Sequence, residues 1–257
     1  MPKYAANLSM LFGEVDFLDR FGAAAKAGFK GVEYLSPYEV PADRIAEELD
    51  RHGLSQVLFN LPSGDWTRGE RGIACHPKRV SEFRDGVETA SAYAGILGNT
   101  RINCLAGIVP PDVPRELAEE TLIANLQYAA GRLAEAGILL LVEAINTFDI
   151  PGFLLSGSRQ TIGILDRAGA ANLRLQYDIY HMQRMEGEIA GTIERLLPRI
   201  AHIQIAGNPG RTEPDRGEID YGYLIKRIDE LGYDGWIGAE YKPTGMTTDG
   251  LRWLTQL

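Results

Sequence analysis

Short runs of apolar residues alternate along the whole chain with longer amphipathic stretches. Several of the short runs are apolar at almost every position, which is typical of strands that are covered on both faces. These eight predicted strands are Tyr4–Ser9, Gly31–Leu35, Ser55–Asn60, Arg101–Gly107, Ile138–Ala144, Leu173–Asp178, Ile200–Ala206 and Trp236–Tyr241. Helical patterns separate them, and four of these patterns end at a glycine before the next strand, at Gly28, Gly137, Gly169 and Gly232.

Eight alternating strands and helices predict an α/β protein, a (β/α)8 TIM barrel. The 257 residues give about 32 residues for each strand and helix, which suits one βα unit. The alternative is an open doubly wound sheet, which needs a glycine-rich phosphate loop, and neither GxGxxG nor GxxxxGK[ST] occurs. No linker divides the chain, so we expect one domain over residues 1–257. The irregular segment Leu61–Pro77 follows the third strand and is predicted to form a lid.

Composition and charge narrow the classes of function. The net charge is −9 and basic residues form no block, which argues against a nucleic-acid partner. No apolar run reaches the ~18–20 residues of a membrane span, and the first residues lack the apolar core of a secretion signal. A cytoplasmic protein is therefore expected. The two cysteines, Cys75 and Cys104, are expected to be reduced thiols.

Polar side chains end four consecutive strands near the carboxyl-terminal edge, where the active sites of TIM barrels lie. The fifth strand ends in Glu143, the sixth in Asp178 and the eighth in Glu240, while the seventh carries Gln204. His202 shares the inward face of the seventh strand with Gln204, one layer deeper, and a packing role with one satisfied hydrogen bond is expected for it.

Each of these strand ends, taken singly, is explained by a polar residue that faces water. Three carboxylates gathered at one edge need a cation to offset their repulsion. An all-oxygen set of ligands suits a hard ion, so the sequence predicts one divalent cation, Mg²⁺ or Mn²⁺, bound by Glu143, Asp178, Gln204 and Glu240.

Further candidates for substrate binding lie near the same edge. His181 follows the sixth strand and could orient a ligand or contact a substrate hydroxyl, or be a solvated loop residue. Arg211 could hold a substrate carboxylate or form a surface salt bridge, and Lys242 is a weaker candidate for the same task. Asn60 and Asn103 end the third and fourth strands and could bind substrate hydroxyls or turn backbone.

An ordered set of motifs carries a family resemblance. It comprises Glu143, DxYH at Asp178–His181, HIQIAGxPGR at His202–Arg211, GEIDY at Gly217–Tyr221 and GAEYKP at Gly238–Pro243. Together with the opening YAANLSMLF and the segments GERGIAC and PKRVSEFR, this order resembles the xylose-isomerase-like TIM barrel superfamily. More narrowly, it is similar to the hydroxypyruvate isomerase family, including its 2-oxo-tetronate isomerase branch.

The resemblance implies a metal on Glu143, Asp178, Gln204 and Glu240, with the two glutamates as the catalytic acid and base. It implies isomerisation of a small 2-oxo acid, hydroxypyruvate or its four-carbon 2-oxo-tetronate analogue, through an enediol. It also makes a homo-oligomer plausible. Ketose 3-epimerases carry a histidine where Gln204 stands, which favours the isomerase branch. The alternatives are a ketose 3-epimerase or another sugar isomerase, a non-catalytic barrel, and a DNA-repair phosphodiesterase.

Overall fold

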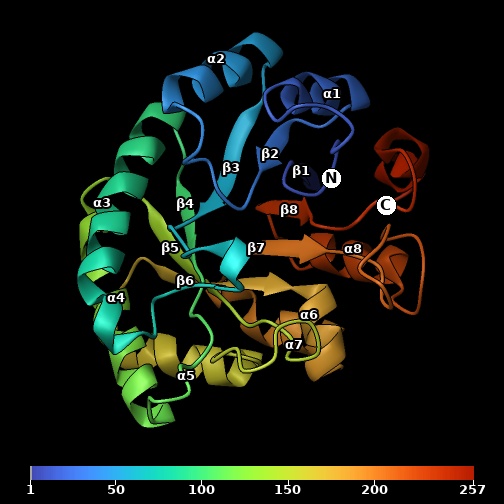
Figure 1. The fold of residues 1–257 in the computed structure, drawn as a ribbon. Helices are drawn as coiled ribbons and strands as arrows, with labels where there is room; N and C mark the ends of the chain where they lie inside the picture. Colours follow the sequence, from blue (N-terminus) through green and yellow to red (C-terminus); the bar gives the residue numbers. More distant parts are fainter. Residues whose placement is uncertain (1) are drawn as a thin grey trace. The chain divides into compact units, whose positions relative to one another are not determined.

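The computed structural model describes residues 2–257, in which eight parallel strands follow one another in chain order around a closed barrel (Figure 1). This arrangement confirms the predicted (β/α)8 fold. The strands are β1 Lys3–Asn7, β2 Gly31–Glu33, β3 Ser55–Asn60, β4 Arg101–Cys104, β5 Leu139–Glu143, β6 Leu173–Asp178, β7 Ile200–Ile205 and β8 Trp236–Ala239. The bounds of β3 and β6 match the prediction. The expectation that Glu240 ends the eighth strand is wrong, because β8 stops at Ala239 and Glu240 is the next residue.

Helices separate the strands, as the alternating pattern predicts. They are α1 Asp19–Ala27, α2 Ala42–His52, α3 Val80–Leu97, α4 Arg115–Ala134, α5 Ser158–Ala168, α6 Ile179–Met185, α7 Ile189–Leu196 and α8 Tyr221–Glu230, with 3-10 turns at η1 Trp66–Arg68, η2 Pro77–Arg79, η3 Leu197–Arg199 and η4 Thr247–Thr255. The four predicted glycine stops all have positive φ, which glycine adopts without strain. Within residues 2–257, no helix combines the length and the apolar character that a membrane-spanning segment needs.

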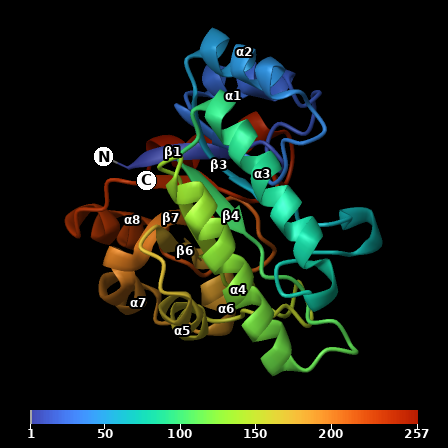
Figure 2. The ribbon, with the colours of Figure 1, turned by 90° about the vertical axis from the view of Figure 1, so that its left-hand side faces the viewer.

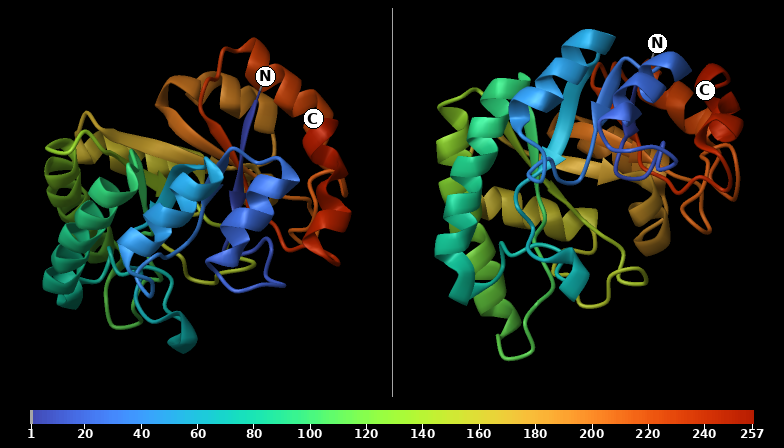
Figure 3. Two further views of the ribbon diagram at one scale, coloured as in Figure 1. Left: turned by 90° about the horizontal axis from the view of Figure 1, so that it is seen from above. Right: turned by 45° about the horizontal axis from the view of Figure 1, so that its top comes forward.

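The chain packs as two compact units, one formed by residues up to 57 with residues 178–257, the other by residues 58–177. In the first unit, β1 pairs with β2 and β8, and β7 pairs with β8. The register places Asn7 beside Glu33 and Gln204 beside Gly238. Figure 3 shows the C-terminal segment beside the N-terminal strand, where the ring of Trp253 in η4 meets that of Tyr4 edge to face at 5.3 Å.

In the second unit, β4 pairs with β3 and β5, and β5 pairs with β6. Helices α3 and α4 lie side by side (Figure 2). Glu88 of α3 accepts hydrogen bonds from Arg132 and Tyr128 of α4, and these bonds lower the pKa of Glu88 to about 2. Both cysteines, Cys75 and Cys104, are free, as predicted, and both are buried.

The predicted lid, residues 61–77, belongs to the second unit and holds the short η1 turn. Asp65 caps this turn, because its carboxylate accepts hydrogen bonds from the N–H groups of Thr67 and Arg68. The guanidinium of Arg71 lies 4.3 Å from the centre of the Trp66 ring. The segment is thus an ordered loop, and its movement as a lid stays a prediction, as does the single domain over residues 1–257.

Candidate active site

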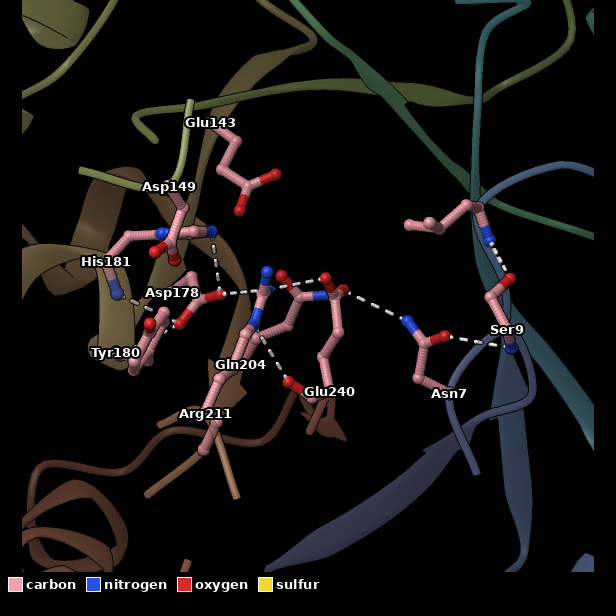
Figure 4. Close-up of polar contacts among 12 residues, drawn as sticks. Asn7, Ser9, Glu143, Asp149, Asp178, Tyr180, His181, Gln204, Arg211 and Glu240 are labelled. Carbon is pink, nitrogen blue, oxygen red and sulfur yellow. Dashed lines mark hydrogen bonds and ion pairs between the residues drawn. The ribbon is translucent and has the colours of Figure 1, made fainter. Parts of the chain in front are cut away.

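Two amide side chains hold Glu240 at the carboxyl-terminal end of β8. Asn7, the last residue of β1, donates from Nδ2 to Glu240 Oε2 over 3.0 Å. Gln204 of β7 donates from Nε2 to the same oxygen. Figure 4 shows the three side chains pointing toward one another, and all three are buried. One oxygen of Glu240 is therefore fixed by two amide donors from the strands on either side.

Arg211 forms ion pairs with both Glu240 and Asp178. Its Nη2 lies 2.6 Å from Glu240 Oε1 and 3.0 Å from Asp178 Oδ2 (Figure 4). The side chain of Arg211 is 15% exposed, so both ion pairs are largely shielded from water. Its guanidinium carbon lies 5.2 Å from the centre of the Tyr180 ring, within cation–π range.

The backbone of Arg211 has an unusual conformation. Its φ is 56°, a value that few residues other than glycine adopt. The N–H of Lys242 donates to the carbonyl of Arg211 over 2.7 Å, and Gly207 and Thr212 bridge the base of the loop. Such strain persists where the surroundings fix it, and it concentrates at functional sites.

Asp178 has two structural partners besides Arg211. It caps α6, because Oδ1 accepts hydrogen bonds from the N–H groups of Tyr180 and His181. Its Oδ2 lies 3.5 Å from Nε2 of His181. Burial raises the pKa of the Asp178 carboxyl above its usual range, although Arg211 and these N–H groups oppose the shift.

His181 is buried, so the solvated-loop interpretation of this residue is wrong. Burial, with Arg211 and Arg184 nearby, holds the pKa of His181 well below its usual range. The imidazole is therefore neutral at pH 7. Burial also raises the pKa of Glu240, an effect that Arg211 opposes and Asp178 reinforces. A cation placed at these oxygens favours their ionised forms.

In the second unit, an asparagine and a glutamine likewise donate hydrogen bonds to one oxygen of Glu143, the last residue of β5. Asn103 of β4 donates from Nδ2 to Glu143 Oε2 over 3.2 Å, and Gln176 of β6 donates from Nε2 to the same oxygen over 3.0 Å. Asn103 also donates to Oδ1 of Asn60 over 3.1 Å. Glu143 and Glu240 are thus each held at one oxygen by an asparagine and a glutamine.

Sequence reasoning missed the carboxylate of Glu33, the last residue of β2. This side chain is fully buried and accepts hydrogen bonds from Asn7 over 3.1 Å and Gln204 over 2.7 Å. His202 Nε2 lies 2.6 Å from its other oxygen, which agrees with the packing role expected for His202. Asn7 was missed as well. Both residues end strands in the structure, but the predicted strands Tyr4–Ser9 and Gly31–Leu35 each run two residues further, so the rule that found Glu143 passed over them.

The donor set fits a hard divalent cation. Asp178, His181, Gln204 and Glu240 are buried in the first unit, and Glu143 is buried in the second. Asp178 and Glu240 together carry more negative charge than their shared partner Arg211 offsets when both are ionised. Carboxylate and amide oxygens are the ligands that Mg²⁺ and Mn²⁺ prefer. The residues present could therefore hold one such ion.

The predicted site residues fall into two groups. In the first unit the structure joins Asp178, Gln204, Glu240, Arg211 and His181 through direct contacts or a shared partner. Lys242 differs, because its side chain is exposed and its backbone N–H donates to the carbonyl of Arg211.

In the second unit the structure joins Glu143, Asn103 and Asn60. The side chain of Asn103 donates to other side chains, and its Oδ1 is buried without a hydrogen-bond partner among residues 2–257.

Comparison with known proteins agrees with the resemblance seen in the sequence. Residues 21–257 match the family model of the xylose isomerase-like TIM barrel. The chain is 53% identical to hydroxypyruvate isomerase of Escherichia coli (strain K12) and 49% identical to 2-oxo-tetronate isomerase of Cupriavidus necator, in each case over 99% of this chain and 98% of the relative. The crystal structure of "AP endonuclease, family 2" from Brucella melitensis is 46% identical, with a TM-score of 0.97 over 100% of this chain and 99% of that one.

Proposed function

This chain belongs to the xylose isomerase-like TIM barrel family, and we propose that it isomerises a small 2-oxo acid. The proposed reaction converts hydroxypyruvate to tartronate semialdehyde, or acts on the four-carbon 2-oxo-tetronate analogue. The observation that carries this proposal is the matched support of Glu143 and Glu240, each held by two amides from the neighbouring strands. The names of the E. coli and C. necator relatives support the substrate class.

We further propose that one divalent cation, Mg²⁺ or Mn²⁺, binds to Glu143, Asp178, Gln204 and Glu240. The burial of all four side chains, the three carboxyl groups among them and the order of their strands around the barrel support this ligand set. When bound, the cation would polarise the substrate carbonyl and stabilise negative charge on its oxygen.

The chain's own residues carry the proton transfers in this proposal. One of Glu143 and Glu240 removes a proton from C3 of hydroxypyruvate, which gives an enediol. The other delivers a proton to C2, while the C3 hydroxyl loses its proton and the C2 oxygen gains one. Each carboxylate has one oxygen fixed by amides, so its second oxygen is held in a defined direction. Positioned groups of this kind typically contribute ~10²–10⁴-fold to the rate.

Arg211 and Lys242 are the proposed partners of the substrate carboxylate. Arg211 already binds two carboxylates, and its planar guanidinium suits a third that approaches from the solvent side. His181, Asn60 and Asn103 are proposed to bind substrate oxygens. The neutral state of His181 and the unpartnered Oδ1 of Asn103 support these roles.

A substrate panel tests the proposed function. The Mg²⁺-loaded protein is given hydroxypyruvate, a 2-oxo-tetronate, D-fructose, D-psicose and a duplex with an abasic site, with the Glu143→Gln variant as the control. The two acids are expected to react and the other compounds to stay unchanged. Turnover of a ketose with both acids inert would assign the chain to the epimerases. Cleavage of the duplex would contradict the proposal, and the net charge of −9 opposes that binding.

A cytoplasmic location and a homo-oligomeric state are also proposals. The two free cysteines support a reducing compartment. Light scattering during size-exclusion chromatography measures the oligomeric state directly, and a mass of 28.3 kDa would identify a monomer.

A further inference from the structure

A closed ring of hydrogen bonds joins Glu33 to Glu240. The amide nitrogens of Asn7 and Gln204 each donate to Glu33 Oε1 and also to Glu240 Oε2. Two carboxylate oxygens and two amide groups therefore satisfy one another, and each amide uses both of its N–H bonds. The other oxygen of Glu33 faces Nε2 of His202 at 2.6 Å.

This ring determines which way the Gln204 amide faces. An amide has one donor side and one acceptor side, and an ionised carboxylate only accepts. Because Glu33 and Glu240 both lie against the nitrogen of Gln204, a rotated amide would place its oxygen against two negative groups and lose two hydrogen bonds. The carbonyl oxygen of Gln204 is thus turned away from both carboxylates.

The contacts of His202 agree with donation to Glu33. Its Nδ1 is buried and has no hydrogen-bond partner in the part of the chain that the structure describes. A ring N–H on Nε2 donates to Glu33 Oε2 and leaves the bare Nδ1 in that position. The two amides and the imidazole therefore all donate to the oxygens of Glu33.

The barrel also leaves room for this carboxylate. A Cβ atom at Gly238 would lie 2.4 Å from both oxygens of Glu33, closer than any such contact can be. The missing side chain of Gly238 thus leaves the space that the carboxyl group of Glu33 occupies. Asn103, which holds Glu143, donates its other hydrogen bond to the amide oxygen of Asn60. Gln204, which holds Glu240, donates its other hydrogen bond to the carboxyl group of Glu33. The additional carboxyl group is therefore found beside Gln204 and not beside Asn103.

We infer that Glu33 is a positioning residue, which orients the Gln204 amide so that its oxygen, and not its nitrogen, is presented to the cation. The inference rests on the proposed metal site. Glu33 touches neither the cation nor the substrate in this account, and it acts through Gln204 and Asn7. Outer groups that orient a metal ligand typically contribute 10–100-fold to metal affinity.

Mn²⁺ affinity, measured by electron paramagnetic resonance on chelator-treated protein, tests the inference. Glu33→Met keeps the length of the side chain and removes both acceptor oxygens, so we expect at least tenfold weaker binding. Glu33→Gln retains one oxygen that can accept from both amides, but its amide nitrogen faces Nε2 of His202, so its affinity should lie between those of Glu33→Met and the wild type. Glu48→Gln, which removes a partly buried carboxylate of α2, is the control and should bind as the wild type does.

The outcomes separate the inference from the proposed function. Wild-type protein that binds no Mn²⁺ would reject the metal site itself. Wild type and Glu33→Met binding Mn²⁺ equally would overturn the role of Glu33. If circular dichroism shows that Glu33→Met is unfolded, Gly238→Ala, which displaces Glu33, is compared with Gly245→Ala, where a Cβ meets nothing within 4 Å. Equal affinity of these two variants would also overturn the inference, and a tenfold loss in Gly238→Ala alone would support it.

Discussion

Replacing Arg211 by alanine removes the positive charge that two buried carboxylates share. Asp178 and Glu240 have side chains that are 1% and 8% exposed, so water can replace the guanidinium only in part. Removal of one partner from a buried ion pair typically costs ~3–5 kcal/mol. For a chain of this size, each kcal/mol lowers Tm by ~2–4 °C, which predicts a fall of ~6–20 °C in the presence of a chelator.

The size of this loss depends on pH in a defined direction. Burial raises the pKa of both carboxyls, so they take up protons more readily than exposed acids do. A protonated carboxyl needs no cation, and the variant should therefore lose less stability at pH 5 than at pH 8. Added Mg²⁺ or Mn²⁺ should raise the Tm of Arg211→Ala more than that of the wild type, because the cation replaces the missing charge.

Thermal unfolding followed by circular dichroism measures these effects, with Arg44→Ala as the control. Arg44 pairs with Glu47 at 3.5 Å on α2, and the two side chains are 58% and 60% exposed. Exposed pairs contribute ~0–1 kcal/mol, so this control should shift Tm only slightly. If Arg211→Ala unfolds at the same temperature as Arg44→Ala at pH 8, the ion pairs of Arg211 do not stabilise the protein and the reasoning is refuted.

Three other perturbations test separate parts of the account. Glu143→Gln and Glu240→Gln should each lower kcat by ~10²–10⁴-fold with little change in KM, and near wild-type turnover in steady-state assays would exclude that residue as acid or base. Gly238→Ala should lose ~1–3 kcal/mol in urea unfolding because its Cβ clashes with a buried carboxylate, while Gly245→Ala should lose less. The pKa of Glu88 is lowered to about 2, so its stabilising contribution is full above the ordinary glutamate range and is lost as the pH falls through 2. The Tm difference between wild type and Glu88→Gln should therefore shrink from pH 5 to pH 2, and a constant difference would contradict this.

Much of the fold could be predicted from local pattern. Ser55–Asn60 and Leu173–Asp178 are apolar runs with a polar last residue, and the structure ends both strands where the pattern does. Helix ends were marked by glycines such as Gly28, whose φ of 104° explains the choice of residue. The end of the eighth strand was predicted too late, because apolar residues continue to Tyr241 whereas the last residue paired with β7 is Ala239.

The site could be predicted only in outline. The polar residue at the end of an apolar strand identified Glu143 and Asp178, because a carboxylate is costly to bury there unless a partner offsets its charge. The same rule applies to Glu33, but its strand is only three residues long and its partners lie 26 to 171 positions away in the chain. The ion pairs of Arg211 could not be predicted from the sequence. Arg211 lies in a loop and has a positive φ, and residue spacing does not predict where the side chain of such a residue points.

The central claim is that this chain moves a proton between C3 and C2 of a 2-oxo acid. Hydroxypyruvate incubated with the Mg²⁺-loaded protein in D₂O, followed by proton NMR, tests it directly. We expect tartronate semialdehyde to form, with deuterium entering at the carbon that is reprotonated. We expect both effects to be lost in Glu143→Gln and Glu240→Gln. Unchanged hydroxypyruvate, with no deuterium incorporated by folded and metal-loaded protein, would contradict the account.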